Sequence, residues 1–248
     1  MSALLILLAV MGGWEAYAQL SGVAQFILPA PSEVATALVD DRALLWSNFT
    51  VTAGEIGLGI GAAIALGLAC AIALHFSPPL RRGVYPLLIA SQTLPIPIVA
   101  PLLIVWFGFG LTPKIAIIAL VCFFPIVVPT LDALGRVDAD LRKLMRSFGA
   151  TRWQTFRIVE APAALPGLFT GAKLSVAVAT IAAVLAEQSG SENGLGRLFL
   201  QALPQFETPR AYAAVLLLCA FAVLLFWLLA LAERRLLPWS VQSRGTAP

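Results

Sequence analysis

Six apolar stretches, each close to 20 residues long, constrain this chain more than any other feature. A helix of that length crosses the hydrocarbon core of a bilayer and satisfies its own backbone hydrogen bonds there. Apolar residues make up 60% of the chain and charged residues only 12%, which is typical of a polytopic membrane protein. We therefore predict an all-α transmembrane helical bundle, a single domain over residues 1–248. Its six spans are expected at about 3–20, 53–76, 84–109, 114–134, 167–188 and 211–231.

The first connection and the second stretch carry local packing signals. After two prolines, Ser32 is placed to cap a short amphipathic helix over Glu33–Val39. In the second stretch, Gly54, Gly57 and Gly61 share one face at helical spacing. Small residues let helix backbones approach closely, so we expect this face to be a packing surface.

The third stretch carries Pro95, Pro97 and Pro101. Each proline removes a backbone donor, so this helix must be kinked or broken near the middle of the membrane. Irregular backbone is tolerated there only against protein or a water-filled cavity, so this span should line a pathway. Gln92, one turn before Pro95, either contacts the transported solute or satisfies a freed carbonyl.

Other polar side chains within the spans allow two interpretations each. Lys173 lies one to two turns inside the fifth stretch and either snorkels to the surface or gates the pathway. Glu187 ends that stretch and either caps loop groups or faces the pathway. Glu55, near the start of the second stretch, is expected at the membrane interface. The candidate pathway residues are Gln92, Pro95, Pro97, Lys173 and Glu187.

Positive charges are distributed unevenly among the connections, and this predicts orientation. If the long polar connection, residues 136–166, faces the cytoplasm, eleven Lys and Arg residues lie inside and four outside, with Lys173 within a span. We therefore expect both termini in the cytoplasm. The inner set is Arg81, Arg82, Arg136, Arg142, Lys143, Arg146, Arg152, Arg157, Arg234, Arg235 and Arg244, and the outer set is Arg42, Lys114, Arg197 and Arg210.

Residues 138–162 form a charged, helix-capable segment that is long for a connection between spans. Asp138 and Asp140 fall in the first turn of a helix, where the helix dipole favours anions. Gly149 is expected to turn the chain into a second helix, which Thr151 caps and Pro162 ends. Apolar residues recur at helical spacing and face either the protein's own helix ends or a partner's groove. They are Leu141, Leu144, Met145, Phe148, Trp153, Phe156 and Val159.

Several function classes are disfavoured by what the sequence contains. Cys70, Cys122 and Cys219 lie apart in apolar runs, and His75 is the only histidine, so neither a metal site nor a catalytic set is predicted. The glycine- and serine-rich loop 189–196 lacks the Gly-Lys-Ser/Thr ending of a nucleotide-binding loop.

The polar segment resembles the cytoplasmic loop of permease subunits in binding-protein-dependent ABC importers. In that family a glycine is followed, after a nine-residue gap, by an aliphatic residue and a terminal proline, as Gly149 and Val159-Glu160-Ala161-Pro162 are here. Lys143-Leu144-Met145 replaces the family's Glu-Ala-Ala, so the role of that acidic residue does not carry over. Leu28–Val34, Ala100–Gly110 and Phe123–Ile126 are similar to other parts of the family.

The resemblance implies a type I ABC importer permease fold in a bacterial inner membrane. It implies two permease copies, an extracytoplasmic substrate-binding protein, and cytoplasmic ATPase subunits that bind ATP and Mg, so no cofactor is expected in this chain. It also implies that the loop around Ser147 to Trp153 is a coupling helix that docks on the ATPase. The expected coupling residues are Lys143, Met145, Arg146, Ser147, Phe148, Gly149, Ala150, Thr151, Arg152, Trp153 and Pro162.

The resemblance also bears on the cargo. The Pro-Ile-Pro form at Pro95–Pro97, Thr208-Pro209-Arg210 and the ending Leu236–Trp239 look closer to permeases for hydroxymethylpyrimidine, a thiamine precursor, or for riboflavin. The alternative is a sulfonate, taurine or nitrate permease. A further alternative is an ion-coupled secondary transporter, which predicts paired intramembrane carboxylates and two matching halves. Asp132 is the lone candidate for such a role.

Overall fold

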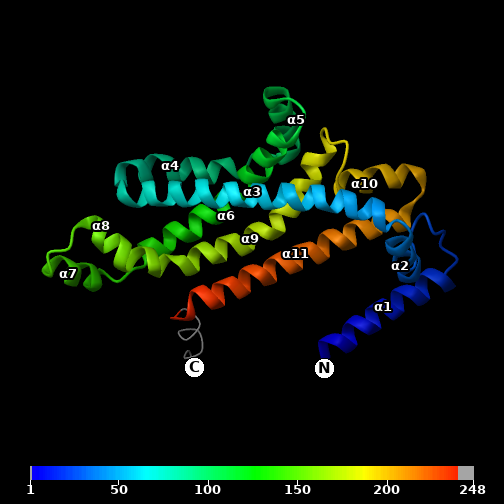
Figure 1. Ribbon diagram of the computed structural model, residues 1–248, viewed down its shortest axis with the longest axis horizontal. Coiled ribbons are helices and arrows are strands. Elements are labelled where there is room, and N and C mark those ends of the chain that lie inside the picture. Colours follow the sequence, from blue (N-terminus) through cyan, green and yellow to red (C-terminus); the bar gives the residue numbers. More distant parts are fainter. Residues whose placement is uncertain (1, 240–248) are drawn as a thin grey trace.

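The computed structural model describes residues 2–239, and Arg244 lies outside this range. The described chain is built from helices, confirming the all-α class (Figure 1). They are α1 (Ser2–Leu20), α2 (Pro31–Asp40), α3 (Arg42–Phe76), α4 (Pro78–Ser91), α5 (Ile96–Phe107), α6 (Leu111–Gly135), α7 (Ala139–Ser147), α8 (Arg152–Thr155), the π-helical turn η1 (Phe156–Glu160), α9 (Ala161–Gln188), α10 (Leu195–Ala202), the 3₁₀ turn η2 (Leu203–Gln205) and α11 (Thr208–Leu236).

Within residues 2–239, four continuous helical segments are long and apolar enough to cross a membrane: α3, α6, α11 and the run Arg152–Gln188. A fifth candidate is the pair α4 and α5, whose axes meet at 105°. The first predicted span corresponds to a shorter apolar helix, Leu5–Leu20. The second predicted span lies within α3, which begins at Arg42, eleven residues before it.

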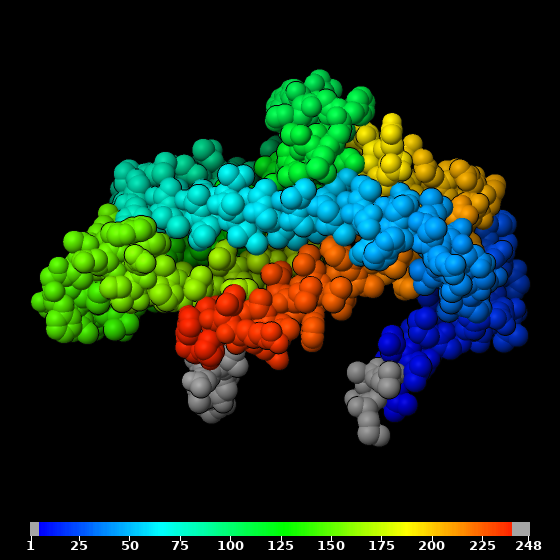
Figure 2. All heavy atoms as spheres, in the orientation of Figure 1, coloured from blue at the N-terminus to red at the C-terminus, as the bar shows by residue number. Residues whose placement is uncertain are grey.

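The bend between α4 and α5 confirms the predicted break in the third span. α4 ends at Ser91, Pro95 forms the N-cap of α5, and Pro97 lies in its first turn. Proline is well tolerated at these positions because the first N–H groups of a helix have no intrahelical acceptor. As a result α5 projects from the long body of the molecule (Figure 2).

The core lies where α6 packs between α3 and α9. Ile56 of α3, Ile118 and Ile126 of α6, and Ala179 and Ala183 of α9 are fully buried in one cluster. α11 runs beside this group (Figure 1) and adds buried alanines. Large side chains on α6 thus meet small ones on α9, which allows these helices to lie close together.

The predicted glycine packing face of α3 is wrong within this chain. Gly54, Gly57 and Gly61 have no neighbour from the described residues within 4 Å of the position a Cβ would occupy. The close approach instead uses Gly67, where a Cβ would lie 2.8 Å from Ile126 of α6. The sequence showed which residues are small, but not which face of α3 meets α6.

The predicted cap of the short amphipathic helix is also wrong. Ala30 is the N-cap of α2, and its N–H donates to Glu33 at 2.8 Å. Ser32 lies inside the first turn, where its N–H and its hydroxyl both donate to the Glu15 carboxylate of α1, at 2.9 and 2.6 Å. Glu15, which weakens the first apolar stretch, therefore satisfies donors at the start of α2.

The molecule has two dissimilar ends. α7 and α8 lie at one end of the long helices, and α2 and α10 lie at the other (Figure 1). We call these the α7–α8 end and the α2–α10 end.

Candidate functional site

The α7–α8 end presents a polar helix to solvent. Asp138, which was predicted in the first turn of this helix, is the N-cap of α7, and its Oδ1 accepts from the Asp140 N–H at 2.8 Å. Lys143 pairs with Asp140 at 2.8 Å, and both side chains are largely exposed. In the part of the chain that the structure describes, no residue of α7 is buried.

The turn after α7 has the left-handed backbone that the sequence predicted. Gly149 has φ +75°, a region that glycine adopts without a steric penalty. The Gly149 N–H donates to the Arg146 carbonyl at 2.9 Å, and the Ala150 N–H donates to the Met145 carbonyl at 3.0 Å. Thr151 then caps α8, as predicted, by accepting from the Gln154 N–H at 3.3 Å.

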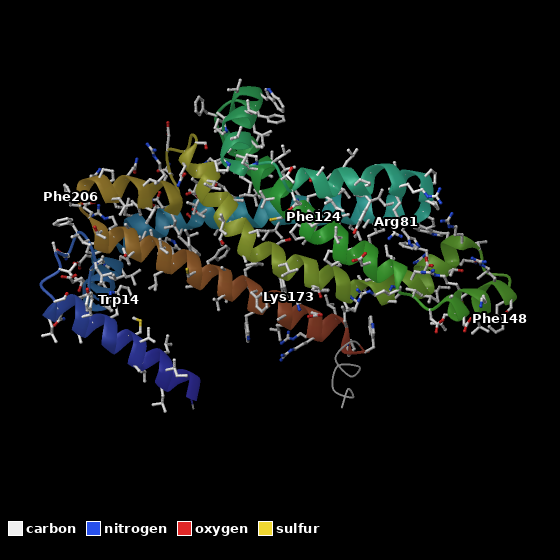
Figure 3. All side chains as sticks on the ribbon, turned by 180° about the vertical axis from the view of Figure 1, so that it is seen from behind. Trp14, Arg81, Phe124, Phe148, Lys173 and Phe206 are labelled. Atoms are coloured by element: carbon white, nitrogen blue, oxygen red, sulfur yellow. The ribbon has the colours of Figure 1, made fainter. Side chains whose placement is uncertain are left out.

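Large apolar side chains are exposed around this turn. Leu144 is 50% exposed, Trp153 58% and Phe148 78%. Figure 3 shows Phe148 at the extremity of this end. The predicted apolar stripe of α7 is therefore not covered by the protein's own helix ends.

An aromatic cluster fixes α8 to the end of α3. Trp153 stacks on Phe156 with ring centroids 5.3 Å apart, and Phe156 lies 5.0 Å from Phe76. The Arg152 guanidinium sits 5.0 Å from the centre of the Phe76 ring. One face of the Trp153 ring thus packs against Phe156, and the rest of the side chain is exposed.

The prediction that Pro162 ends the second helix is wrong. The chain continues from α8 through η1 directly into α9, with Pro162 in the first turn of α9. In η1 the Ala161 N–H donates five residues back, to the Phe156 carbonyl. This wider turn shifts the bonding register just before the residue that lacks an N–H, so the helix continues past the proline.

A basic cavity of about 480 Å³ lies behind the turn. Arg81 of α4 is among its lining residues, and Figure 3 labels it near this end. Glu160 is the carboxylate of this cavity; its Oε1 lies 2.7 Å from Arg142 Nε and its Oε2 lies 2.7 Å from His75 Nε2. The lining arginines are Arg81, Arg142, Arg146 and Arg152.

The candidate pathway residues are not brought together at one point. Gln92 is exposed and caps the C-terminus of α4, at the edge of a small cavity of about 70 Å³ between α4, α5 and α6. Lys173 forms an ion pair with α11, because its Nζ lies 2.7 Å from the Glu233 carboxylate. Figure 3 labels Lys173 in the middle part of the molecule.

Glu187 caps loop groups, in agreement with one of its two predicted interpretations. Its Oε2 accepts from the N–H groups of Gly196 and Arg197 at 2.6 and 3.1 Å, in the first turn of α10. Its Oε1 accepts from the Thr52 hydroxyl of α3 at 2.6 Å. A carboxylate at a helix N-terminus is stabilised by the unpaired N–H groups and the helix dipole.

Sequence reasoning missed the ion pair beside it. Glu55, which was expected at the membrane interface, is 1% exposed within the helix bundle, and its Oε1 lies 2.6 Å from Lys114 Nζ of α6. Lys114 also donates to the Ser191 hydroxyl at 2.6 Å. Glu55 and Lys114 line a cavity of about 700 Å³, with Phe109 and residues 190–193. Their place in long apolar helices was the available signal, since charges there need partners.

Comparison with known families identifies the class of protein. Residues 63–238 match the model of the binding-protein-dependent transport system inner membrane component. The chain belongs to this family and is a multi-pass permease subunit of an ABC importer, not an enzyme.

Curated relatives extend the likeness over almost the whole chain. The chain is 33% identical to the formylaminopyrimidine transport permease protein ThiX of Halalkalibacterium halodurans, covering 95% of this chain and 94% of the relative. It is 38% identical to the riboflavin transport system permease protein RibX of Chloroflexus aurantiacus, covering 91% and 85%.

A solved structure supports the fold. An inward-facing MetNI methionine ABC transporter contains a chain that matches with a TM-score of 0.65 at 23% identity, over 79% of this chain and 96% of that one. This confirms the type I importer permease fold that the sequence predicted.

Proposed function

We propose that two copies of this chain enclose a pathway across the bacterial inner membrane, with the α7–α8 end and both termini in the cytoplasm. Cytoplasmic ATPase subunits dock on the α7–α8 end, and an extracytoplasmic binding protein delivers cargo to the α2–α10 end. The excess of positive charge on the connections near the α7–α8 end supports this orientation.

The observation that carries this proposal is the exposed apolar tip around Gly149. Phe148 and Trp153 project from a polar helical hairpin whose base is fixed by the aromatic cluster and by the Glu160 ion pairs. Large aromatic side chains on a rigid projection are the usual anchors of a protein interface. Because η1 joins this hairpin to α9 without a break, a displacement of the tip is transmitted to a spanning helix.

Transport follows from alternating access. The ATPase subunits bind ATP and Mg, and their closure favours the outward-open permease over the inward-open one. Nucleotide can shift this equilibrium only by its difference in affinity for the two states of the complex. This chain supplies the pathway and the hairpin through which the shift is transmitted.

We propose a neutral nitrogen heterocycle, a hydroxymethylpyrimidine-type thiamine precursor or a flavin, as the cargo. The formylaminopyrimidine and riboflavin relatives support this class. The polar groups at the α2–α10 end also support it, because the Glu55 carboxylate pairs with Lys114 and the Glu187 carboxylate lies beside Glu55. Two neighbouring carboxyls with one ammonium disfavour a sulfonate or nitrate anion.

The test is transport by the purified complex. Proteoliposomes containing the permease, its ATPase and its binding protein are assayed with radiolabelled hydroxymethylpyrimidine, riboflavin and taurine. We expect ATP-dependent uptake of a heterocycle and not of taurine. Uptake of taurine alone contradicts the cargo, and uptake without the ATPase contradicts the mechanism.

A further inference from the structure

The cavity beside Glu55 and Lys114 has the features of a binding site. Both residues belong to spanning helices, α3 and α6, where ionisable groups are costly and usually serve a function. The pair lies toward the α2–α10 end, well separated along α3 and α6 from the hairpin at Gly149 (Figure 1). The mechanism of coupling makes no use of it.

The Glu55–Lys114 pair does not use all of its hydrogen-bonding groups. Glu55 is 1% exposed, no N–H or hydroxyl group in the range 2–239 donates to its Oε2, and the Glu187 carboxyl is its neighbour. Lys114 has three N–H donors, and its acceptors in that range are Glu55 and Ser191. One acceptor and one donor are therefore left over in residues that line the same cavity. A buried polar atom without a partner is unfavourable unless something else binds it.

The remaining walls suit a flat ring. Phe109 is 80% exposed and lines the cavity. It lies close to Gly190, where an added Cβ would meet its ring at 2.8 Å, so the ring is set against the loop on one side. The free side offers an aromatic face on which a heterocycle can stack.

From this juxtaposition we propose that the cavity is a cargo site that reads the edge of a neutral nitrogen heterocycle. Glu55 Oε2 accepts from an exocyclic amino group, the free Lys114 N–H donates to the adjacent ring nitrogen, and Phe109 stacks on the ring. This inference rests on the proposed function and deepens it, since it places part of the selectivity in the permease and names its groups.

The test pairs a change in the protein with a change in the cargo. Uptake per ATP hydrolysed is measured in the reconstituted complex for hydroxymethylpyrimidine with and without its 4-amino group. Selectivity contributed by the binding protein is the same for every permease variant, so it cancels when variants are compared. We expect Glu55→Gln to reduce the preference for the amino compound by about tenfold, because the amide presents a donor where an acceptor is needed.

A second variant leaves the buried pair intact. Phe109→Ala should lower uptake per ATP by about tenfold for both compounds without changing the preference between them. The matched control is Trp227→Ala, an exposed aromatic of α11 that does not line the cavity. It should not change uptake per ATP.

The outcomes separate the two proposals. The first case is that the wild-type complex transports the amino compound. If Glu55→Gln and Phe109→Ala then have the rate and the preference of the wild type, the site assignment is wrong and the proposed function stands. If the wild-type complex transports neither pyrimidine, the pyrimidine cargo is wrong, and the site assignment fails with it, whereas riboflavin uptake would still support the proposed function. A preference lost in Glu55→Gln while the control is unchanged supports the site.

Discussion

The two ends of this permease place charged residues in opposite environments, exposed at one end and buried at the other. At the α7–α8 end, charged side chains such as Lys143 and Asp140 are exposed, and aromatic ones such as Phe148 project outward. At the α2–α10 end, Glu55 and Lys114 are buried and joined at 2.6 Å. An exposed pair contributes little to stability, whereas a buried pair is sensitive to the loss of one partner. The first end is thus suited to contact a partner, and the second to hold the helices and read a solute.

The largest expected effect lies at the buried end. Lys114→Met should lower the free energy of unfolding by about 3–5 kcal/mol, because it leaves Glu55 buried without its counter-ion. The double variant Glu55→Met with Lys114→Met should recover much of that loss. Denaturant titration in mixed micelles measures both. If the wild type and Lys114→Met had equal free energies of unfolding, the buried pair would be no more sensitive to the loss of one partner than the exposed pair.

The next effect lies at the turn of the hairpin. Gly149→Val forces a β-branched residue to φ +75°, at a cost of about 1–3 kcal/mol. We expect membrane insertion to be unchanged while transport per ATP falls about tenfold or more. Gly83→Val is the control, because Gly83 lies within α4 and has no described neighbour within 4 Å of its Cβ position. Undiminished uptake by Gly149→Val would count against the hairpin as the coupling element.

A smaller effect is expected at the exposed face of the aromatic cluster. Trp153→Ala should weaken association with the ATPase subunit about tenfold, as loss of an aromatic interface anchor does. Trp106→Ala, an exposed tryptophan of α5, serves as the matched control. Affinity is measured by titrating the ATPase onto the permease in nanodiscs. Equal affinities for both variants would mean that Trp153 only packs against Phe156.

The smallest effect is expected for the exposed ion pair. Lys143→Met should change the free energy of unfolding by less than about 0.5 kcal/mol, since the partners are three residues apart on one helix and open to solvent. The same titration used for Lys114→Met measures it. A change as large as that of Lys114→Met would mean that the hairpin is part of the folding core.

The sequence predicts what is local in this fold. Apolar runs identify the long helices, and Asp138, Gly149 and Thr151 mark the hairpin, because a cap or a left-handed turn depends on neighbouring residues only. Contacts between residues far apart in the sequence cannot be predicted in this way. The ion pair of Glu55 was not predicted, because its partner Lys114 is 59 residues away.

The same reasoning explains the errors at Ser32 and Pro162. Ser32 has the residue type of a cap, but Glu15, 17 residues earlier, takes its donors. Pro162 has the residue type of a helix terminator, but the π-helical turn before it absorbs the missing donor. In both cases a rule of local sequence was overridden by a contact or a register that periodicity does not report.

The central claim is that the ATPase acts on the hairpin at one membrane face while solute is received near the other. Labelling with a membrane-impermeant maleimide tests it, in a variant whose native cysteines, Cys70, Cys122 and Cys219, are replaced. We predict that Glu192→Cys is labelled in intact cells, and that Ser147→Cys is labelled only after permeabilisation and is protected when the ATPase is bound. Labelling of Ser147→Cys from outside, or labelling that the ATPase does not change, would contradict the account.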